Sequence, residues 1–136
     1  MVNYTLVFVA TIAQFVLGGL WYSPLMFGRW WMQIMEVTHI SKEELQKIQK
    51  GMAPFYALQF FLTLFTTISF ANLLPYINSF GVYHVAFWIW IGFVAPVQTG
   101  MVVWGNTKKK FWAKQIFVMI AFQLAAFMLM AWILSL

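Results

Sequence analysis

Four long apolar stretches, separated by short polar segments, constrain this chain more than any other feature. They cover about residues 3–22, 54–74, 82–104 and 111–136. A helix rises about 1.5 Å per residue, so about 20 residues cross a hydrocarbon layer of about 30 Å. Only 8% of the residues are charged, against about a quarter in a soluble domain. The pattern predicts one all-α integral membrane domain, with four transmembrane helices in two antiparallel hairpins.

The positions of the basic residues predict how these helices are oriented. All eight Lys and Arg residues lie in two windows, Arg29 to Lys50 and Lys108 to Lys114. Short loops rich in Lys and Arg stay on the cytoplasmic side during insertion. We therefore expect loop 23–53 inside and both termini outside. This bias accounts for the net charge of +5 without a nucleic acid, and anionic lipid at the cytoplasmic face is the expected electrostatic partner.

The first cytoplasmic loop is predicted to form two short helices. From Leu25 to Met35, polar residues recur at helical spacing among aromatic and aliphatic ones. This is typical of an amphipathic helix that lies in the membrane interface or covers the mouth of the bundle. Ser41 and Glu44 match a capping box, which indicates the start of a small polar helix running from Lys42 to about Lys50.

Several positions within the spans are expected to shape how the helices pack. Pro96 removes a backbone donor and should kink the third helix. Small side chains let neighbouring backbones approach closely in a membrane, and the candidates are Gly18, Gly19, Gly92, Gly100, Ala121 and Ala125.

Each predicted span carries one glutamine nearer its cytoplasmic end, which suggests a polar layer in the bundle. The four residues are Gln14, Gln59, Gln98 and Gln123. One interpretation is hydrogen bonding that holds helices together. The other is a polar pocket open to the cytoplasm, with aromatic walls from Trp21, Tyr22 and Trp104. The sequence leaves both interpretations open.

The sequence lacks the residue patterns of common catalytic and metal sites. There is no cysteine, and the only carboxylates are Glu36, Glu43 and Glu44 in the first loop. His39 and His84 belong to opposite ends of the predicted bundle, so they cannot share one metal ion or haem. No ionisable residue lies in the middle of a span, as proton-coupled transport usually requires. We expect no enzyme activity, cofactor or metal.

Two motifs resemble those of a known family. Trp21-Tyr22-Ser23-Pro24-Leu25, followed by Phe27-Gly28 and Trp31, resembles the signature of an uncharacterised bacterial family, domain of unknown function 1761. Gly92-Phe93-Val94-Ala95-Pro96, with Trp104 beyond it, is similar to the second motif of that family. The resemblance covers nearly the whole chain. It implies a four-helix integral protein of the bacterial cytoplasmic membrane, and it implies no activity or ligand.

These observations lead to two expectations for function. The first is a structural or accessory subunit that packs against itself, as a homo-oligomer, or against a larger membrane complex. The alternative is a binding protein or facilitator for an apolar or amphipathic small molecule in a cytoplasm-facing pocket. That pocket would use Gln14, Trp21, Tyr22, Gln98 and Trp104.

Overall fold

The structure is a computed structural model that describes residues 1–77 and 79–136. The long helices are α1 (Tyr4–Trp21), α4 (Ala53–Leu73) and α7 (Trp112–Leu134). A further long helix combines α5 (Val82–Ile89), the π-helical turn η2 (Trp90–Val94) and α6 (Ala95–Val103). Short 3₁₀ turns, η1 (Leu74–Tyr76) and η3 (Lys109–Phe111), flank α4 and α7. Within the described residues, the fold is all-helical, and four helices are long and apolar enough to cross a membrane.

The segment between α1 and α4 contains two short helices, α2 (Gly28–Ile34) and α3 (Lys42–Gly51). The first begins three residues after the expected Leu25, because residues 23–27 form a turn that precedes it. At the start of α3, the Ser41 hydroxyl oxygen accepts a hydrogen bond from the Glu44 N–H at 3.3 Å. This is the contact that a capping box requires.

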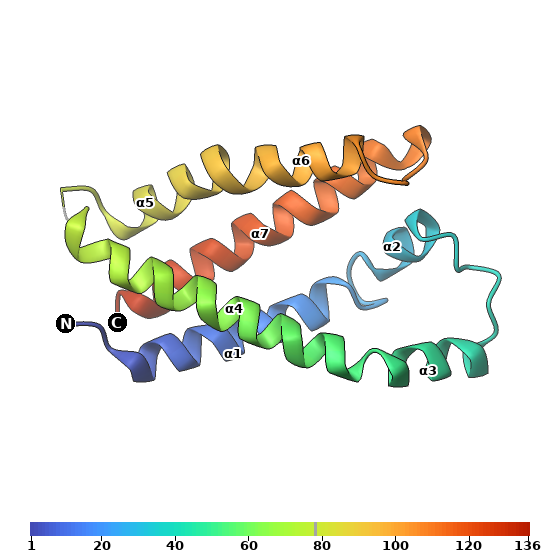
Figure 1. Ribbon diagram of the computed structural model, residues 1–136, viewed down its shortest axis with the longest axis horizontal. Helices are drawn as coiled ribbons and strands as arrows, with labels where there is room; N and C mark the ends of the chain where they lie inside the picture. Colours follow the sequence, from blue (N-terminus) through green and yellow to red (C-terminus); the bar gives the residue numbers. More distant parts are fainter. Residues whose placement is uncertain (78) are drawn as a thin grey trace.

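The long helices lie side by side in the order α4, α1, α7 and α5–α6 (Figure 1). The two chain termini lie at one end of the molecule, which we call the termini end. The opposite end carries the α1–α4 and α6–α7 connections and all the basic residues, and we call it the basic end. Helix α7 has α1 on one side and α5–α6 on the other, whereas α4 packs mainly on α1.

The hydrophobic core is concentrated at the termini end. Residues from all four long helices meet there: Ala10, Phe70, Val85, Ala86, Phe127, Met130, Ala131 and Ile133. The rings of Phe70 and Phe127 meet edge-on, with centroids 6.2 Å apart. Toward the basic end, α4 and α6 diverge (Figure 1). The same four helices therefore form a compact bundle at one end and a row at the other.

The distortion that Pro96 predicts in the third span takes the form of the π-helical turn. The Ala95 N–H donates to the carbonyl of Trp90, five residues earlier, instead of the usual four. Proline has no N–H to continue the ladder, so a wide turn beside Pro96 lets the helix proceed without a break.

The small residues contribute less to packing within the chain than the sequence suggests. A Cβ atom added to Gly19, Gly92 or Gly100 would meet nothing within 4 Å, so no neighbouring helix uses the space they leave. Gly18 differs, because a Cβ there would lie 3.3 Å from the Phe122 ring. Ala121 and Ala125 are half-buried on α7.

Candidate functional site

Residues 21–28, which form the first family-like motif, make a tight turn between α1 and α2. The Ser23 carbonyl accepts hydrogen bonds from the N–H groups of Met26 at 3.1 Å and Gly28 at 2.9 Å. The Ser23 hydroxyl donates to the carbonyl of Leu20 at 2.6 Å. A Cβ atom on Gly28 would lie 2.5 Å from the Ser23 carbonyl carbon, which is a clash with backbone. The serine and the glycine of the motif therefore have a structural explanation.

The aromatic residues of the motif fasten this turn to α7. The Trp21 indole N–H donates to the Val118 carbonyl at 3.0 Å, and its ring lies 4.7 Å from that of Phe27. Tyr22 packs against Phe122 with ring centroids 5.6 Å apart. Further rings extend this aromatic cluster: Trp30, Trp31 and Phe117. Trp21 and Tyr22 thus serve helix packing, and both are half-buried.

A second indole contacts α7 from the α5–α6 side. Trp90, at the start of the π-helical turn, is buried and donates its indole N–H to the Ile120 carbonyl at 2.8 Å. Trp90 lies outside both sequence motifs. Its position within the span could have predicted this contact, because a tryptophan away from the water boundary must find a partner for its N–H inside the protein.

A small polar hollow lies where α1, α4 and α7 meet. Its volume is about 80 Å³, and its lining includes Gln14, Gln59, Leu62, Thr63, Thr66, Phe122, Gln123 and Ala126. Gln14 is buried and donates from Nε2 to the Thr67 hydroxyl at 2.8 Å and to the Ala10 carbonyl at 3.1 Å. The amide therefore joins α1 to α4. A drug-sized ligand needs a pocket of at least about 300 Å³, so this hollow is too small to enclose one.

The structure does not bring the four glutamines into one layer. Three of them line the polar hollow, but Gln98 lies on α6 and is not among its lining residues. The reason is the order of the helices, which places α7 between α4 and α6. Within the described residues, the buried Oε1 atoms of Gln98 and of Gln115 on α7 have no hydrogen-bond partner. Trp104 is 90% exposed. The five residues expected for a ligand pocket therefore do not converge.

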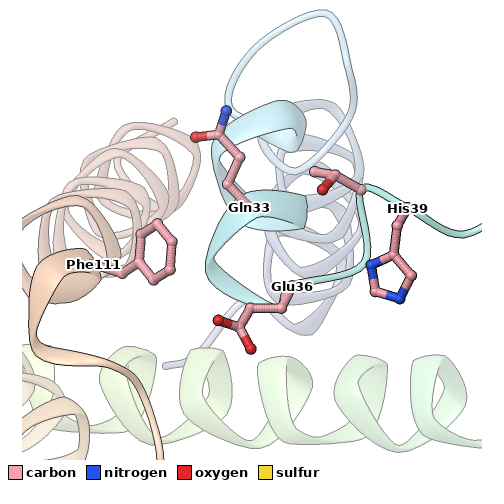
Figure 2. Close-up of a pocket in the computed structure, with 5 residues that line it drawn as sticks. Gln33, Glu36, His39 and Phe111 are labelled. Atoms are coloured by element: carbon pink, nitrogen blue, oxygen red, sulfur yellow. The ribbon is translucent and has the colours of Figure 1, made fainter.

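A larger and open hollow of about 470 Å³ lies at the basic end, next to α2 (Figure 2). Its lining consists of Gln33, Glu36, Thr38, His39 and Phe111. The Glu36 carboxylate pairs with the Lys108 ammonium at 2.6 Å, and this hydrogen bond lowers the pKa of Glu36 below its ordinary value. Lys114 donates to the Gln33 side-chain oxygen at 3.4 Å. These contacts join the two basic connections, and Glu36 adopts a left-handed backbone with φ 57° at the end of α2.

A family model matches nearly the whole chain. The family described as Protein of unknown function (DUF1761) matches residues 5–135. The chain belongs to the DUF1761 family. The family predicted from the two motifs is thus confirmed. No curated protein and no solved structure matches this DUF1761 chain.

In this DUF1761 member, the geometry assigns residues of the first motif to helix packing. The indole N–H groups of Trp21, and of Trp90 outside the motifs, bond to carbonyls of α7, and Gly28 allows the turn that places Trp21 there. Among the described residues, no group of three or more His, Cys, Asp or Glu side chains is arranged to hold a metal ion. Among the described residues, the surfaces open to interaction include the polar hollow, the open hollow at the basic end and the exposed side of α4.

Proposed function

We propose that this DUF1761 protein is a non-enzymatic integral protein of the bacterial cytoplasmic membrane with both termini outside. Four long apolar helices support the membrane assignment, and the confinement of all Lys and Arg residues to one end supports the orientation. We further propose that the protein acts as a structural or accessory subunit, which packs against itself or against a larger membrane complex.

The exposed side of α4 is the observation that carries the accessory role. Helix α4 packs mainly on α1, so much of its surface has no neighbour within the chain. The exposed side includes large rings, with Phe61 at 63% and Phe65 at 71%, and also polar side chains from Gln59, Thr66 and Ser69. These side chains already donate hydrogen bonds within α4, from Gln59 to Thr63 and from the Thr66 and Ser69 hydroxyls to backbone carbonyls. Lipid chains offer no donors to their oxygen atoms, whereas a neighbouring helix does. This surface is suited to a protein neighbour.

The small-molecule alternative has less support. It needs Gln14, Gln98 and Trp104 around one pocket, yet Gln14 is bonded to Thr67, Gln98 lies on another helix and Trp104 faces outward. The polar hollow that does exist, at about 80 Å³, holds water more readily than an organic ligand.

Native mass spectrometry of protein released from its own membrane into lipid nanodiscs, without overexpression, tests the accessory role. We expect the 15.9 kDa chain to leave the nanodisc in a stoichiometric assembly, with itself or with other polypeptides. Dilution of the nanodisc lipid before release is the control for chance co-localisation. A lone chain in all preparations would contradict the proposal.

Orientation is tested separately, because the chain has no cysteine and accepts single reporters. We expect a cysteine replacing Ser135 to react with a membrane-impermeant maleimide in intact cells. A cysteine replacing Lys109, in the basic run, should react only after the membrane is opened. The reverse pattern would contradict the proposed orientation.

A further inference from the structure

The polar hollow between α1, α4 and α7 has polar groups that the contacts within the chain leave unpaired. Gln14 is buried, with 5% of its surface exposed, and its Nε2 lies 3.1 Å from the Ala10 carbonyl and 2.8 Å from the Thr67 hydroxyl. A carbonyl oxygen only accepts hydrogen bonds, so the amide atom beside Ala10 must be the nitrogen. Both N–H groups of Gln14 are thereby used, and its Oε1 is the atom left to bond within the hollow.

Gln59 and Thr66 bring further acceptors from α4. The Gln59 Nε2 donates to the Thr63 hydroxyl at 3.2 Å, and that hydroxyl donates to the Gln59 backbone carbonyl at 2.9 Å. These bonds leave the side-chain oxygen and one N–H group of Gln59 unused. The Thr66 hydroxyl donates to the Leu62 carbonyl at 3.0 Å and keeps its lone pairs. The lining from α1 and α4 therefore offers mainly oxygen acceptors.

Gln123 brings donors from α7. None of the hydrogen bonds among the described lining residues involves its side chain. A carboxamide carries two N–H donors and one acceptor oxygen. The hollow thus combines donors from α7 with acceptors from the other two helices, and no direct bond joins them.

The hollow lies next to the place where α4 and α7 touch. Phe70 and Phe127 join these two helices edge-on, with ring centroids 6.2 Å apart. Thr66 and Gln123 each precede one of those rings by four residues, about one helical turn toward the basic end. Elsewhere α4 and α7 are connected chiefly through α1, which packs on both. The occupant of the hollow therefore decides whether α4 and α7 are also joined on that side.

Size and polarity select the occupant. The lining contains no charged side chain, which disfavours an ion. Hydrocarbon offers no hydrogen bonds, so an acyl chain in the hollow would leave the amides of Gln14 and Gln123 unpaired. A volume of about 80 Å³ is too small for a drug-sized ligand but has room for roughly two or three water molecules at about 30 Å³ each. Water also donates and accepts, as this lining requires.

We propose that the polar hollow binds a small cluster of water molecules, which joins Gln123 of α7 to Gln14 of α1 and Gln59 of α4. The N–H groups of Gln123 donate to the water, and the water donates to the Oε1 atoms of Gln14 and Gln59. A buried water typically makes about three hydrogen bonds, and this lining supplies partners of both kinds. The cluster takes the place of direct contact between α4 and α7 at this level of the bundle.

This inference goes beyond the accessory role, because it concerns the inside of one chain. The oxygen atoms of Gln59 and Thr66 each have two lone pairs, so they can bond to water in the hollow and to a protein neighbour outside it. Ser69 is exposed on α4 and is not among the residues that line the hollow. It therefore separates the outer surface of α4 from the water site.

Magnetisation transfer from water to side-chain amides, measured by NMR in lipid nanodiscs, tests the cluster. We expect transfer to the Nε2 protons of Gln123 in nanodiscs of phosphatidylcholine, a lipid with no hydroxyl or N–H group. The sign of the rotating-frame signal distinguishes a bound water from proton exchange with the solvent. Trp90 is the internal control, because its buried indole N–H already bonds to the Ile120 carbonyl, within one turn of Gln123 along α7. The indole proton should receive no transfer.

Two matched substitutions on α4 locate the water. Thr66→Leu places a longer apolar side chain in the hollow, so the transfer to Gln123 should be lost. Ser69→Leu changes an exposed hydroxyl residue outside the hollow and should leave the transfer unchanged. Both hydroxyls donate to carbonyls of their own helix, so the two variants lose equivalent hydrogen bonds. An unshifted Trp90 indole signal shows in the same spectrum that each variant keeps its fold.

Three results would overturn the water cluster. The first is no transfer in the unmodified chain, or transfer to Gln123 from acyl-chain protons, which would mean that lipid fills the hollow. The second is transfer in phosphatidylglycerol nanodiscs but not in phosphatidylcholine, which would assign the hydroxyl to a lipid headgroup. The third is equal loss in Thr66→Leu and Ser69→Leu. A lone chain in native mass spectrometry would contradict the accessory role and leave this inference standing.

Discussion

Helices α7 and α4 have similar lengths and similar apolar character, yet they occupy different environments. Helix α7 (23 residues) lies between α1 and α5–α6, and Val118, Met130 and Ala131 along it are fully buried. Helix α4 (21 residues) packs mainly on α1 and keeps most of its surface exposed. Apolar composition therefore marks a candidate span without showing whether it will be central or peripheral.

The two helices also differ in how they hydrogen-bond to the rest of the bundle. Helix α7 is held by indole N–H groups from Trp21 and Trp90, which bond to its backbone carbonyls. Helix α4 bonds to α1 through the Thr67 side chain, which accepts from Gln14, and its Gln59, Thr63 and Thr66 side chains line the polar hollow. Neighbouring side chains bond to backbone carbonyls of the central helix α7, whereas Gln14 bonds to a side chain of the peripheral helix α4. The polar side chains on the exposed side of α4 remain available for a partner.

The largest expected effect comes from the turn that attaches α1 to α7. Gly28→Ala should lower the free energy of unfolding by about 3 kcal/mol, because the new Cβ would overlap the Ser23 carbonyl, which is backbone and cannot rotate away. Reversible unfolding in mixed detergent micelles measures the change. Gly19→Ala is the matched control, since its Cβ meets nothing, and it should be neutral or slightly stabilising. Equal effects would show that the turn is not specified by Gly28.

A core truncation tests the contrast between the helices directly. Met130→Ala on α7 should cost about 2 kcal/mol, because it opens a cavity at a position with 0% exposure. Phe65→Ala on α4 removes a larger side chain but should change the unfolding free energy of the single chain little, since that ring is 71% exposed. The same unfolding measurement serves both variants. A larger loss for Phe65→Ala would place α4 inside the fold and break the comparison.

A smaller effect is expected at the hydrogen bond from Trp21 to the backbone of α7. Trp21→Phe keeps an aromatic ring beside Phe27 but removes the donor to the Val118 carbonyl. The expected loss is about 1 kcal/mol of unfolding free energy, the usual net value of one hydrogen bond. Trp112→Phe is a useful control, because its indole N–H bonds to the nearby Thr107 carbonyl and does not join two long helices. A loss as large in the control would argue against a special role for Trp21.

The smallest expected effect concerns the ion pair at the basic end. Lys108 lowers the pKa of Glu36, so the pair stabilises the folded chain above the ordinary carboxyl pKa, and this contribution is lost as pH falls through the lowered value. Unfolding measured from about pH 7 down to about pH 3 covers this window. Glu36→Gln should flatten the pH dependence slightly, and Lys108→Gln should do the same. An unchanged slope in both variants would mean that the pair contributes nothing in solution.

The parts of the fold that the sequence predicted rest on strong local signals. The four long helices follow from uninterrupted apolar stretches, and the start of α3 follows from the spacing of Ser41 and Glu44. The start of α2 was placed three residues early, because the turn around Ser23 depends on hydrogen bonds to its carbonyl that periodicity does not report. Pro96 was expected to kink the third helix, and the structure shows a π-helical turn just before it.

The candidate site shows a different limit. Equal depth suggested that four glutamines form one layer, yet depth fixes only the position along a helix axis and not the direction in which a side chain points. Gln98 lies on α6 and does not line the hollow with the other three, and α7 lies between α6 and α4. The sequence by itself determined the four apolar helices, the one-sided charge and the family, since these depend on composition and local order. Tertiary structure alone decided which helix is central and which side of α4 stays open, because these depend on packing between segments far apart in the chain.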